Sequence, residues 1–426
     1  MQIKQPIDLL IEARWVLPMT PGDATLESHA VAVADGRIVA LGATAALGAR
    51  FAPRERIVRA DHVLLPGLTN AHARLAGGDA AGGTETVRER LRLQLARMLL
   101  AGITSFASDD PFPQECARVA GAARMRAAVG LPLGEPGDAV QDPIVQLARA
   151  EELWDEHRSS PWVSLYFAPA SAHLLPDATL ARVRTVADEL DARVAMPVHA
   201  STAELERSRE RFGRRPLERL AALGFLRPGF TAVHLNEAEE SELELIARTA
   251  VSVVLTPQAD ARRARGSGLS ARLIARGVLP GLGSGAALPG AALDVLAEAR
   301  CAALLGAAAG RSAPDAPAAL EMATLGGACA LGLGALTGSI EPGKAADLVA
   351  VELDALSPCA EEPHASLVYG ATRAQVSDVW IGGRAAVAQH QLLAFDAQEL
   401  RSLAARERTH EPTLPDATAA LRRSAP

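Results

Sequence analysis

The feature that most restricts the fold of this 426-residue chain is an alternation of short apolar runs with helix-like segments through its middle. Between the runs lie stretches such as ETVRERLRLQLARMLLAG, whose apolar residues recur at helical spacing. Eight strands alternating with helices are the count for a closed (β/α)8 TIM barrel, so we predict an α/β fold. The expected strands span residues 63–67, 103–107, 127–133, 163–168, 194–198, 231–234, 251–256 and 278–282.

Both ends of the chain have a different texture. The segment HAVAVADGRIVALG places two apolar runs around Asp35 and Gly36, which indicates a two-residue hairpin. After the expected barrel, GSIEPGKAADLVAVELD and SDVWIGGRAAVAQ return to strand and turn patterns. The simplest arrangement pairs these late strands with the early ones in one small, discontinuous β domain. We expect residues 1–62 and 337–392 in that domain, 63–336 in the barrel, and 393–426 in a C-terminal helix and loose tail.

Composition excludes several classes of partner. The net charge is −7, and no basic run is interleaved with aromatic residues, so a nucleic-acid partner is not expected. No uncharged apolar run reaches about 18 residues, so no membrane span is expected. Charged residues inside the apolar N-terminal stretch argue against a signal peptide. The scattered cysteines fit a reducing compartment, so we expect a cytoplasmic protein with a small-molecule ligand. The cysteines are Cys116, Cys301, Cys329 and Cys359.

Histidines follow three of the expected strands, at the strand ends where barrel enzymes carry their chemistry. His72 follows the first strand, His199 follows the fifth, and His234 ends the sixth. Three such side chains can converge on the barrel axis, as metal ligands do. Within NAHAR, however, the position two residues after His72 is Arg74, a permanent cation, where a second histidine would make a strong metal motif.

Several segments together resemble the amidohydrolase superfamily, and in particular its TRZ/ATZ-type hydrolases. These segments are HAVAVADGRIVALG, LLPGLTNAH, GSIEPGKAADLVAVELD and VSDVWIGGR, and the resemblance covers nearly the whole chain. That branch includes methylthioadenosine/S-adenosylhomocysteine deaminases and triazine hydrolases. The resemblance implies a (β/α)8 barrel with a small β-sandwich built from both chain ends. It also implies a homodimer, and hydrolysis of a ring or amide C–N bond by a hydroxide on zinc or another divalent metal.

Carried over position by position, the resemblance assigns metal ligation to His72 and His199. It assigns to His234 a catalytic contact with the metal-bound water or the substrate. The connection after the first strand is also short, so a long substrate-covering lid is expected to be absent.

Four positions depart from the family pattern. The family's second first-strand histidine corresponds to Arg74, and its strand-eight aspartate, a ligand and proton shuttle, corresponds to Gly285. The deaminases' ring-protonating glutamate corresponds to Thr202, and a further substrate histidine corresponds to Ala170, although His173 is close by.

These departures all remove groups that the family uses for metal binding, substrate binding or catalysis. A unit charge 4 Å from Arg74 would interact by about 4 kcal/mol, and a divalent cation would be repelled by about twice that. Gly285 offers neither a ligand nor a base, and the hydroxyl of Thr202 is too weak an acid to protonate a ring nitrogen. The sequence therefore predicts that metal is absent or weakly bound.

We hypothesise that Arg74 fills the space of the absent metal and pairs with Asp109 or Asp110, because a charge in a barrel mouth needs a partner. The alternative for the aspartates is a solvated turn or a helix N-cap. One alternative for Arg74 is a neutral substitution fixed by genetic drift. Another is that Arg74 is a new anion-binding group at the barrel mouth.

Three functions stay open. The first is a protein of the C–N hydrolase lineage with lost or strongly reduced metal-dependent activity, retained as a binding or partner protein. The second is an active hydrolase or deaminase of a purine-like or triazine-like molecule that uses a reduced three-histidine site. The third is a protein that binds an anionic metabolite through Arg74.

Overall fold

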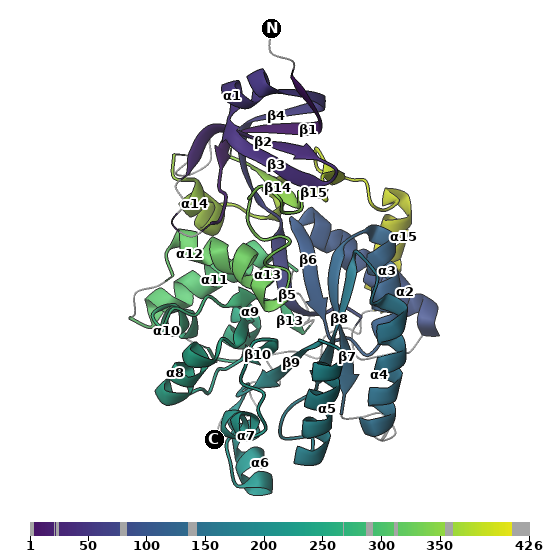
Figure 1. Cartoon of the computed structure of the whole chain (residues 1–426), viewed down its shortest axis with the longest axis vertical. Coiled ribbons are helices and arrows are strands. Elements are labelled where there is room, and N and C mark those ends of the chain that lie inside the picture. The colour runs from purple at the N-terminus through teal and green to yellow at the C-terminus, as the bar shows by residue number, and fades with distance from the viewer. Residues whose placement is uncertain are drawn as a thin grey trace.

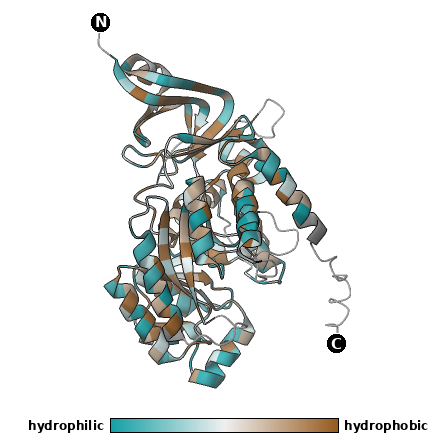
Figure 2. Ribbon diagram, turned by 90° about the vertical axis from the view of Figure 1, so that its right-hand side faces the viewer, coloured by the Kyte–Doolittle hydropathy of each residue, from teal (hydrophilic) through white to brown (hydrophobic). Residues whose placement is uncertain are grey.

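The computed structural model places a small β domain against one end of a helix-wrapped barrel (Figure 1). It describes residues 4–20, 22, 25–76, 83–134, 143–266, 268–286, 293–310, 314–353 and 361–410. Hydrophobic residues gather on the strands inside the barrel, and hydrophilic residues are frequent on the helices around them (Figure 2). In the described part of the chain, no helix combines the length and the apolar character needed to cross a membrane.

The small domain is one mixed sheet of eight strands, built from both ends of the chain as expected. Strand β14 pairs antiparallel with β4 and so joins the two ends, while β1 and β4 run parallel. The hairpin between β2 and β3 is confirmed, because Asp35 and Gly36 both have positive φ, at 49° and 73°. In sheet order the strands are β17 (Gln391–Leu392), β16 (Arg384–Ala388), β15 (Val376–Ile381), β14 (Leu348–Glu352), β4 (Phe51–Pro66), β1 (Gln5–Val16), β2 (Leu26–Ala34) and β3 (Arg37–Ala43).

The expected first barrel strand, residues 63–67, is placed wrongly. Residues 63–66 are the end of β4 and pair with β14 in the small sheet, for example Leu65 with Val349. The first barrel strand is β5 (Leu68–Arg74), so NAHAR lies within a strand rather than after it. The last four residues of β4 and the first six of β5 are buried, and the two strands are separated only by Gly67, so one apolar run covered their junction. The boundary therefore lies at Gly67, where a Cβ atom would stand 2.0 Å from Oγ1 of Thr104.

The barrel itself is confirmed as a ring of parallel strands with helices around it (Figure 1). Its strands after β5 are β6 (Ile103–Ser108), β7 (Arg126–Leu133), β8 (Val163–Pro169), β9 (Arg193–Val198), β10 (Phe230–His234), β11 (Ser252–Leu255), β12 (Gly281–Leu282) and β13 (Gly285–Ala286). The longer helices are α2 (Gly83–Leu100), α3 (Pro113–Ala123), α4 (Pro143–His157), α5 (Asp177–Glu189), α6 (Thr202–Phe212), α8 (Glu240–Thr249) and α11 (Val295–Ala308). Shorter helices are α1 (Thr44–Arg50), α7 (Pro216–Ala222), α9 (Pro257–Ala261), α10 (Leu269–Ile274), α12 (Ala316–Glu321), α13 (Gly327–Ala330) and α14 (Pro363–Ala365).

The eighth barrel strand is divided where the barrel closes. Strand β12 pairs with β11, and β13 pairs with β5. Asn70 holds the break: its Oδ1 accepts the Ser284 N–H at 3.0 Å, and its Nδ2 donates to the Ser284 hydroxyl at 2.9 Å. A Cβ atom on Gly283 would lie 2.6 Å from the His72 carbonyl oxygen, so the closure requires glycine there.

The expected C-terminal helix is present as α15 (Ala397–His410), and it packs beside α2 through two ion pairs. Arg92 contacts Glu399 at 2.7 Å, and Arg406 contacts Glu89 at 2.8 Å. The expected loose tail falls on residues 411–426, outside the described residues, as do Cys359 and residues 77–82, part of the connection where the lid was expected to be absent.

A buried ion pair joins the barrel to the small sheet. Arg126, at the start of β7, binds Asp347 through Nε at 2.5 Å and Nη2 at 3.1 Å, and their side chains are 8% and 0% exposed. Asp347 also accepts the Gly382 N–H at 2.8 Å. Removing one charge from such a pair leaves the other buried without compensation, which is costly.

We therefore expect Asp347→Asn to lower the free energy of unfolding by about 3–5 kcal/mol, measured by urea denaturation. The control is Glu244→Gln, which breaks the exposed pair with Arg248 and should cost less than about 1 kcal/mol. Equal losses in the two variants would contradict a structural role for the buried pair.

Candidate functional site

The carboxyl ends of the barrel strands bring polar side chains from four elements to one mouth. His72 and Arg74 come from β5, Asp109 follows β6, His234 ends β10, and Asp260 lies in α9. The rings of His72 and His234 meet edge to face, with their centroids 5.9 Å apart. The structure therefore brings together two of the three histidines that the sequence analysis singled out.

Arg74 and Asp109 form a two-point ion pair in this mouth. Arg74 Nε donates to Asp109 Oδ1 and Nη2 donates to Oδ2, both at 3.2 Å. The side chains are 34% and 10% exposed, so the pair is partly shielded from water. The two parallel hydrogen bonds fix the guanidinium in orientation as well as in position.

The second aspartate has a different task. Asp110 accepts the N–H groups of Leu75 and Ala76 at 2.8 and 2.9 Å, and the Ser108 hydroxyl donates to it. Burial raises the pKa of Asp110 above its ordinary value, although these three donors oppose that effect. Asp110 therefore anchors the chain as it leaves β5, while Asp109 holds Arg74.

His72 is buried, and charged groups of both signs influence its imidazole. Burial lowers the pKa of its imidazole; Asp109 opposes this effect, and His234 and Arg74 add to it. The neutral ring is the form that can accept a hydrogen bond or ligate a metal.

His234 forms a dyad with Asp260, a residue that the sequence analysis did not identify. Its Nδ1 lies 3.3 Å from Asp260 Oδ1 and 3.1 Å from the Thr256 hydroxyl. Thr256 and Asn236 each donate to Asp260 at 2.8 Å. Burial raises the pKa of Asp260, but the contacts with His234, Thr256 and Asn236 outweigh it and leave the pKa below its ordinary value. A polar residue in the helical turn directly after the seventh strand was the available signal.

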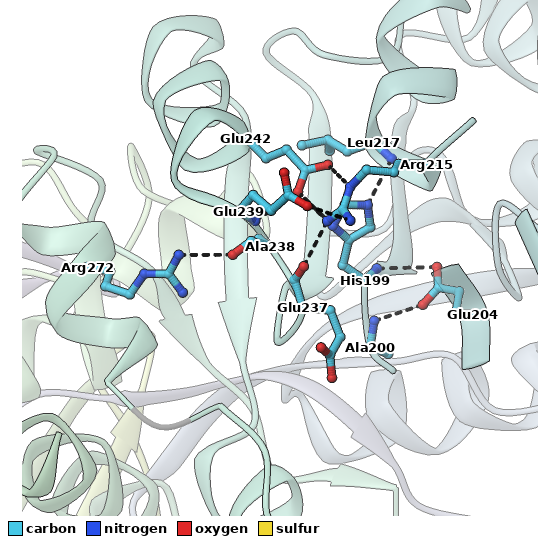
Figure 3. A network of polar contacts seen from close by, with 10 residues as sticks. All are labelled: His199, Ala200, Glu204, Arg215, Leu217, Glu237, Ala238, Glu239, Glu242 and Arg272. Atoms are coloured by element: carbon cyan, nitrogen blue, oxygen red, sulfur yellow. Dashed lines mark hydrogen bonds and ion pairs between the residues drawn. The ribbon is translucent and has the colours of Figure 1, made fainter. Parts of the chain in front are cut away.

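His199 does not join the other two histidines at the mouth. Its backbone is left-handed, with φ at 54°, and its ring lies between α7 and α8 (Figure 3). Nε2 accepts the Leu217 N–H at 3.1 Å, and Nδ1 lies 3.4 Å from Glu242 Oε2. Strand alternation would continue the inward series of Arg193 and Ala195 to His199. The positive φ ends that series and turns the ring outward, so the expected three-histidine set is not assembled.

The strand-five segment presents a different acid from the one expected. Thr202 is exposed at the first position of α6, whereas Glu204 is only 5% exposed. Glu204 accepts the N–H groups of Ala200 and His199 at 2.8 and 3.3 Å, and burial raises its pKa despite these bonds. The pattern Ser201-x-x-Glu204 was the sequence signal for a carboxylate near this helix start.

Two other positions that depart from the family pattern, Gly285 and Ala170, carry no side chain that could bind a metal or transfer a proton. Gly285 has a φ of 70°, and a Cβ atom there would lie 3.2 Å from the Cβ of Ala259. Gly285 pairs with Ala73, whereas Ala286 pairs with Arg74, and a side chain at position 285 would meet Ala259 and Thr256. Ala170 is half-buried, and nearby His173 contacts the Ser171 hydroxyl at 2.7 Å.

The residues present do not fit a closed divalent-metal site. Among the described residues, no group of three or more His, Cys, Asp or Glu side chains is arranged to hold a metal ion. Arg74 follows His72 by two residues on β5, and its charge helps to lower the pKa of that imidazole. Both nitrogens of His199 face helices instead of the mouth. Residues 287–292, which follow β13, lie outside the described residues.

Comparisons with known proteins agree on one lineage. The model of the amidohydrolase family matches residues 63–386. A 5-methylthioadenosine/S-adenosylhomocysteine deaminase from Teredinibacter turnerae is 32% identical over 94% of this chain and 97% of its own length. The crystal structure of an adenosine deaminase from Xanthomonas campestris with bound zinc is 37% identical. It has a TM-score of 0.90 and covers 96% of this chain and 100% of its own. The zinc complex of atrazine chlorohydrolase from Arthrobacter aurescens, at 20% identity, TM-score 0.83 and coverage of 95% and 100%, shares the fold.

The network that holds His199 makes a pH-dependent prediction. Burial raises the pKa of Glu242, but His199 and Arg215 lower it more strongly, to about 2 from 4.5. A depressed carboxylate pKa adds stability that is present above pH 4.5 and is lost as the pH falls toward 2. We expect Glu242→Gln to be less stable than the native chain at pH 7, with the gap narrowing through this window in urea titrations.

The exposed variant Glu244→Gln is the matched control from the same helix. It should show a small difference from the native chain that changes little with pH. A gap for Glu242→Gln that stayed constant from pH 7 to pH 3 would contradict the assigned charge state.

Proposed function

Because the chain belongs to the amidohydrolase family, we propose that its barrel mouth is a C–N hydrolase site in which an ion pair has displaced metal binding. The protein then has little or no metal-dependent deaminase activity. The observation that carries this proposal is the two-point pair between Arg74 and Asp109 beside His72.

Electrostatics supports the proposal. A divalent ion on His72 would share the mouth with a guanidinium that cannot lose its proton. At about 4 Å and an effective dielectric near 20, the repulsion would be about 8 kcal/mol, twice the unit-charge value. Asp109 neutralises Arg74, but it thereby gives both of its oxygens to the guanidinium instead of to a metal.

The remaining family positions support it as well. His199 would have to leave the Leu217 N–H and the Glu242 carboxylate, both of them buried groups, to reach the mouth. Gly285 supplies no carboxylate, and α9 crowds its Cβ position. Reverting a single residue therefore leaves a metal short of ligands.

The direct test is the zinc content of the chain purified from zinc-supplemented cells, followed by ammonia release from 5′-methylthioadenosine, S-adenosylhomocysteine and triazines. We expect well below one zinc per chain and no metal-dependent turnover. We expect Arg74→His with Gly285→Asp to remain substoichiometric, because the His199 ring still lies between α7 and α8. Arg74→Lys is the control that keeps the charge. Stoichiometric zinc with turnover in the native chain would contradict the proposal.

A second candidate function is a live hydrolase that works through the His234–Asp260 dyad. An imidazole held by a charged carboxylate is suited to take a proton from water as that water attacks the carbon of a C–N bond. The proton then passes to the leaving nitrogen, so the products are the hydroxylated carbon and an amine. Glu204, whose pKa is raised by burial, is the candidate acid that would donate a proton to the leaving nitrogen.

If this second function holds, His234→Asn should lower any C–N hydrolysis by about 10²–10⁴-fold in kcat, the usual contribution of a positioned base. The control is His173→Asn, because His173 contacts Ser171 rather than a mouth carboxylate. An activity that survives in His234→Asn would exclude the dyad as its base.

The third candidate function, binding of an anion by Arg74, conflicts with the ion pair between Arg74 and Asp109. Asp109 already binds two of the guanidinium nitrogens, and an incoming anion would have to compete with that carboxylate.

A further inference from the structure

A cavity of about 560 Å³ lies inside the barrel and opens at the end opposite to the mouth. Its inner end is lined by Ala71 and His72. Its outer end is lined by the exposed residues Asp188, Asp191 and Arg227, which lie on connections that precede barrel strands. Such connections form the N-terminal face of a barrel, so this cavity is entered from the face that the proposed hydrolase site does not use.

The cavity exists because the inward-facing positions of neighbouring strands are small. Four alanines from four strands line it, where a packed barrel would place large branched side chains. They are Ala71 of β5, Ala107 of β6, Ala128 of β7 and Ala195 of β9. The volume left is that of a typical small-molecule pocket.

One cation faces this space without a carboxylate partner. Arg193, the first residue of β9, donates from Nη2 to the Ala330 carbonyl at 3.1 Å and to the Ser252 hydroxyl at 3.4 Å. In the part of the chain that the structure describes, no Asp or Glu pairs with it. Arg193 is half-buried and arginine keeps its charge in a protein, so a guanidinium without a carboxylate partner in this cavity favours an anion beside it.

The surroundings of Arg193 hold its side chain in place. Gly332 has a φ of 77°, and a Cβ atom there would lie 3.0 Å from Cδ of Arg193. At the outer end, Arg227 pairs with Asp188, and Asp191 adds one negative charge. Inside the cavity, the positive charge that a ligand can meet is that of Arg193.

We propose that this cavity binds a small organic carboxylate, with the carboxylate on Arg193 and the apolar body against the alanine-lined wall and Tyr166. The two hydrogen bonds that Arg193 makes to neutral oxygens fix its orientation and leave its charge uncompensated. The alanines, Val233 and Leu331 offer the body of a ligand apolar contacts, and Ser164, Thr231 and Tyr166 add hydroxyl groups to the same wall. The cavity shares His72 with the barrel mouth, but the proposal does not depend on hydrolase chemistry there.

The test uses benzoate as the probe and benzamide as its neutral counterpart, with binding to the full chain measured by calorimetry. We expect benzoate to bind and to raise the Tm, and benzamide to bind at least about tenfold more weakly, because it cannot form a charge-assisted pair with Arg193.

Arg193→Met should reduce benzoate affinity to the level of benzamide. Arg214→Met, at an exposed arginine whose ion pair is with Glu218, is the matched control and should leave affinity unchanged.

A second variant tests where benzoate binds without changing the charge of Arg193. Ala128→Leu fills the cavity and should abolish benzoate binding, whereas Ala203→Leu, at an exposed site in α6, should not. If Arg193→Met does not fold, the Ala128→Leu result decides alone. No benzoate binding by the native chain, equal binding of benzoate and benzamide, or binding that survives Ala128→Leu would each overturn the proposal.

Discussion

A permanent positive charge fixed at the end of the first barrel strand determines what the barrel mouth can hold. Arg74 lies on β5, whose position is set by the Asn70–Ser284 clamp that closes the barrel. Its charge cannot be removed by deprotonation, so the structure balances it with Asp109. Under the proposed function, the charge of Arg74 weakens the binding of a second cation in the mouth that it shares with His72.

His199 follows β9 at the position where the sequence resemblance implies a metal ligand, but its ring does not face the mouth. His199 keeps its place after β9, but a left-handed backbone directs its ring into a buried network with Glu242 and the Leu217 N–H. Arg215 binds the same glutamate at 2.7 and 2.8 Å, so the ring is held by charge as well as by packing. Moving the ring to the mouth would leave buried polar groups unpaired, which is costly. The network therefore acts as a structural element where the family pattern has a ligand.

The sequence predicted the architecture well, because strand and helix periodicity is a local property of the chain. Seven of the eight expected barrel strands overlap barrel strands of the structure, and the hairpin at Asp35 and Gly36 follows from its turn chemistry. The error at residues 63–67 arose because the buried end of β4 leads directly into the buried strand β5. The direction of the His199 ring and the presence of Asp260 in the mouth depend on one backbone dihedral and on a short helix after β11. Apolar periodicity carries no information about either.

An anomalous difference map at the zinc edge, from crystals of this chain grown with excess zinc, would show whether a metal binds in the mouth. We expect no peak between His72 and His234, with Arg74 still paired to Asp109. A full-occupancy peak coordinated by His72, together with a His199 ring turned into the mouth, would contradict that expectation.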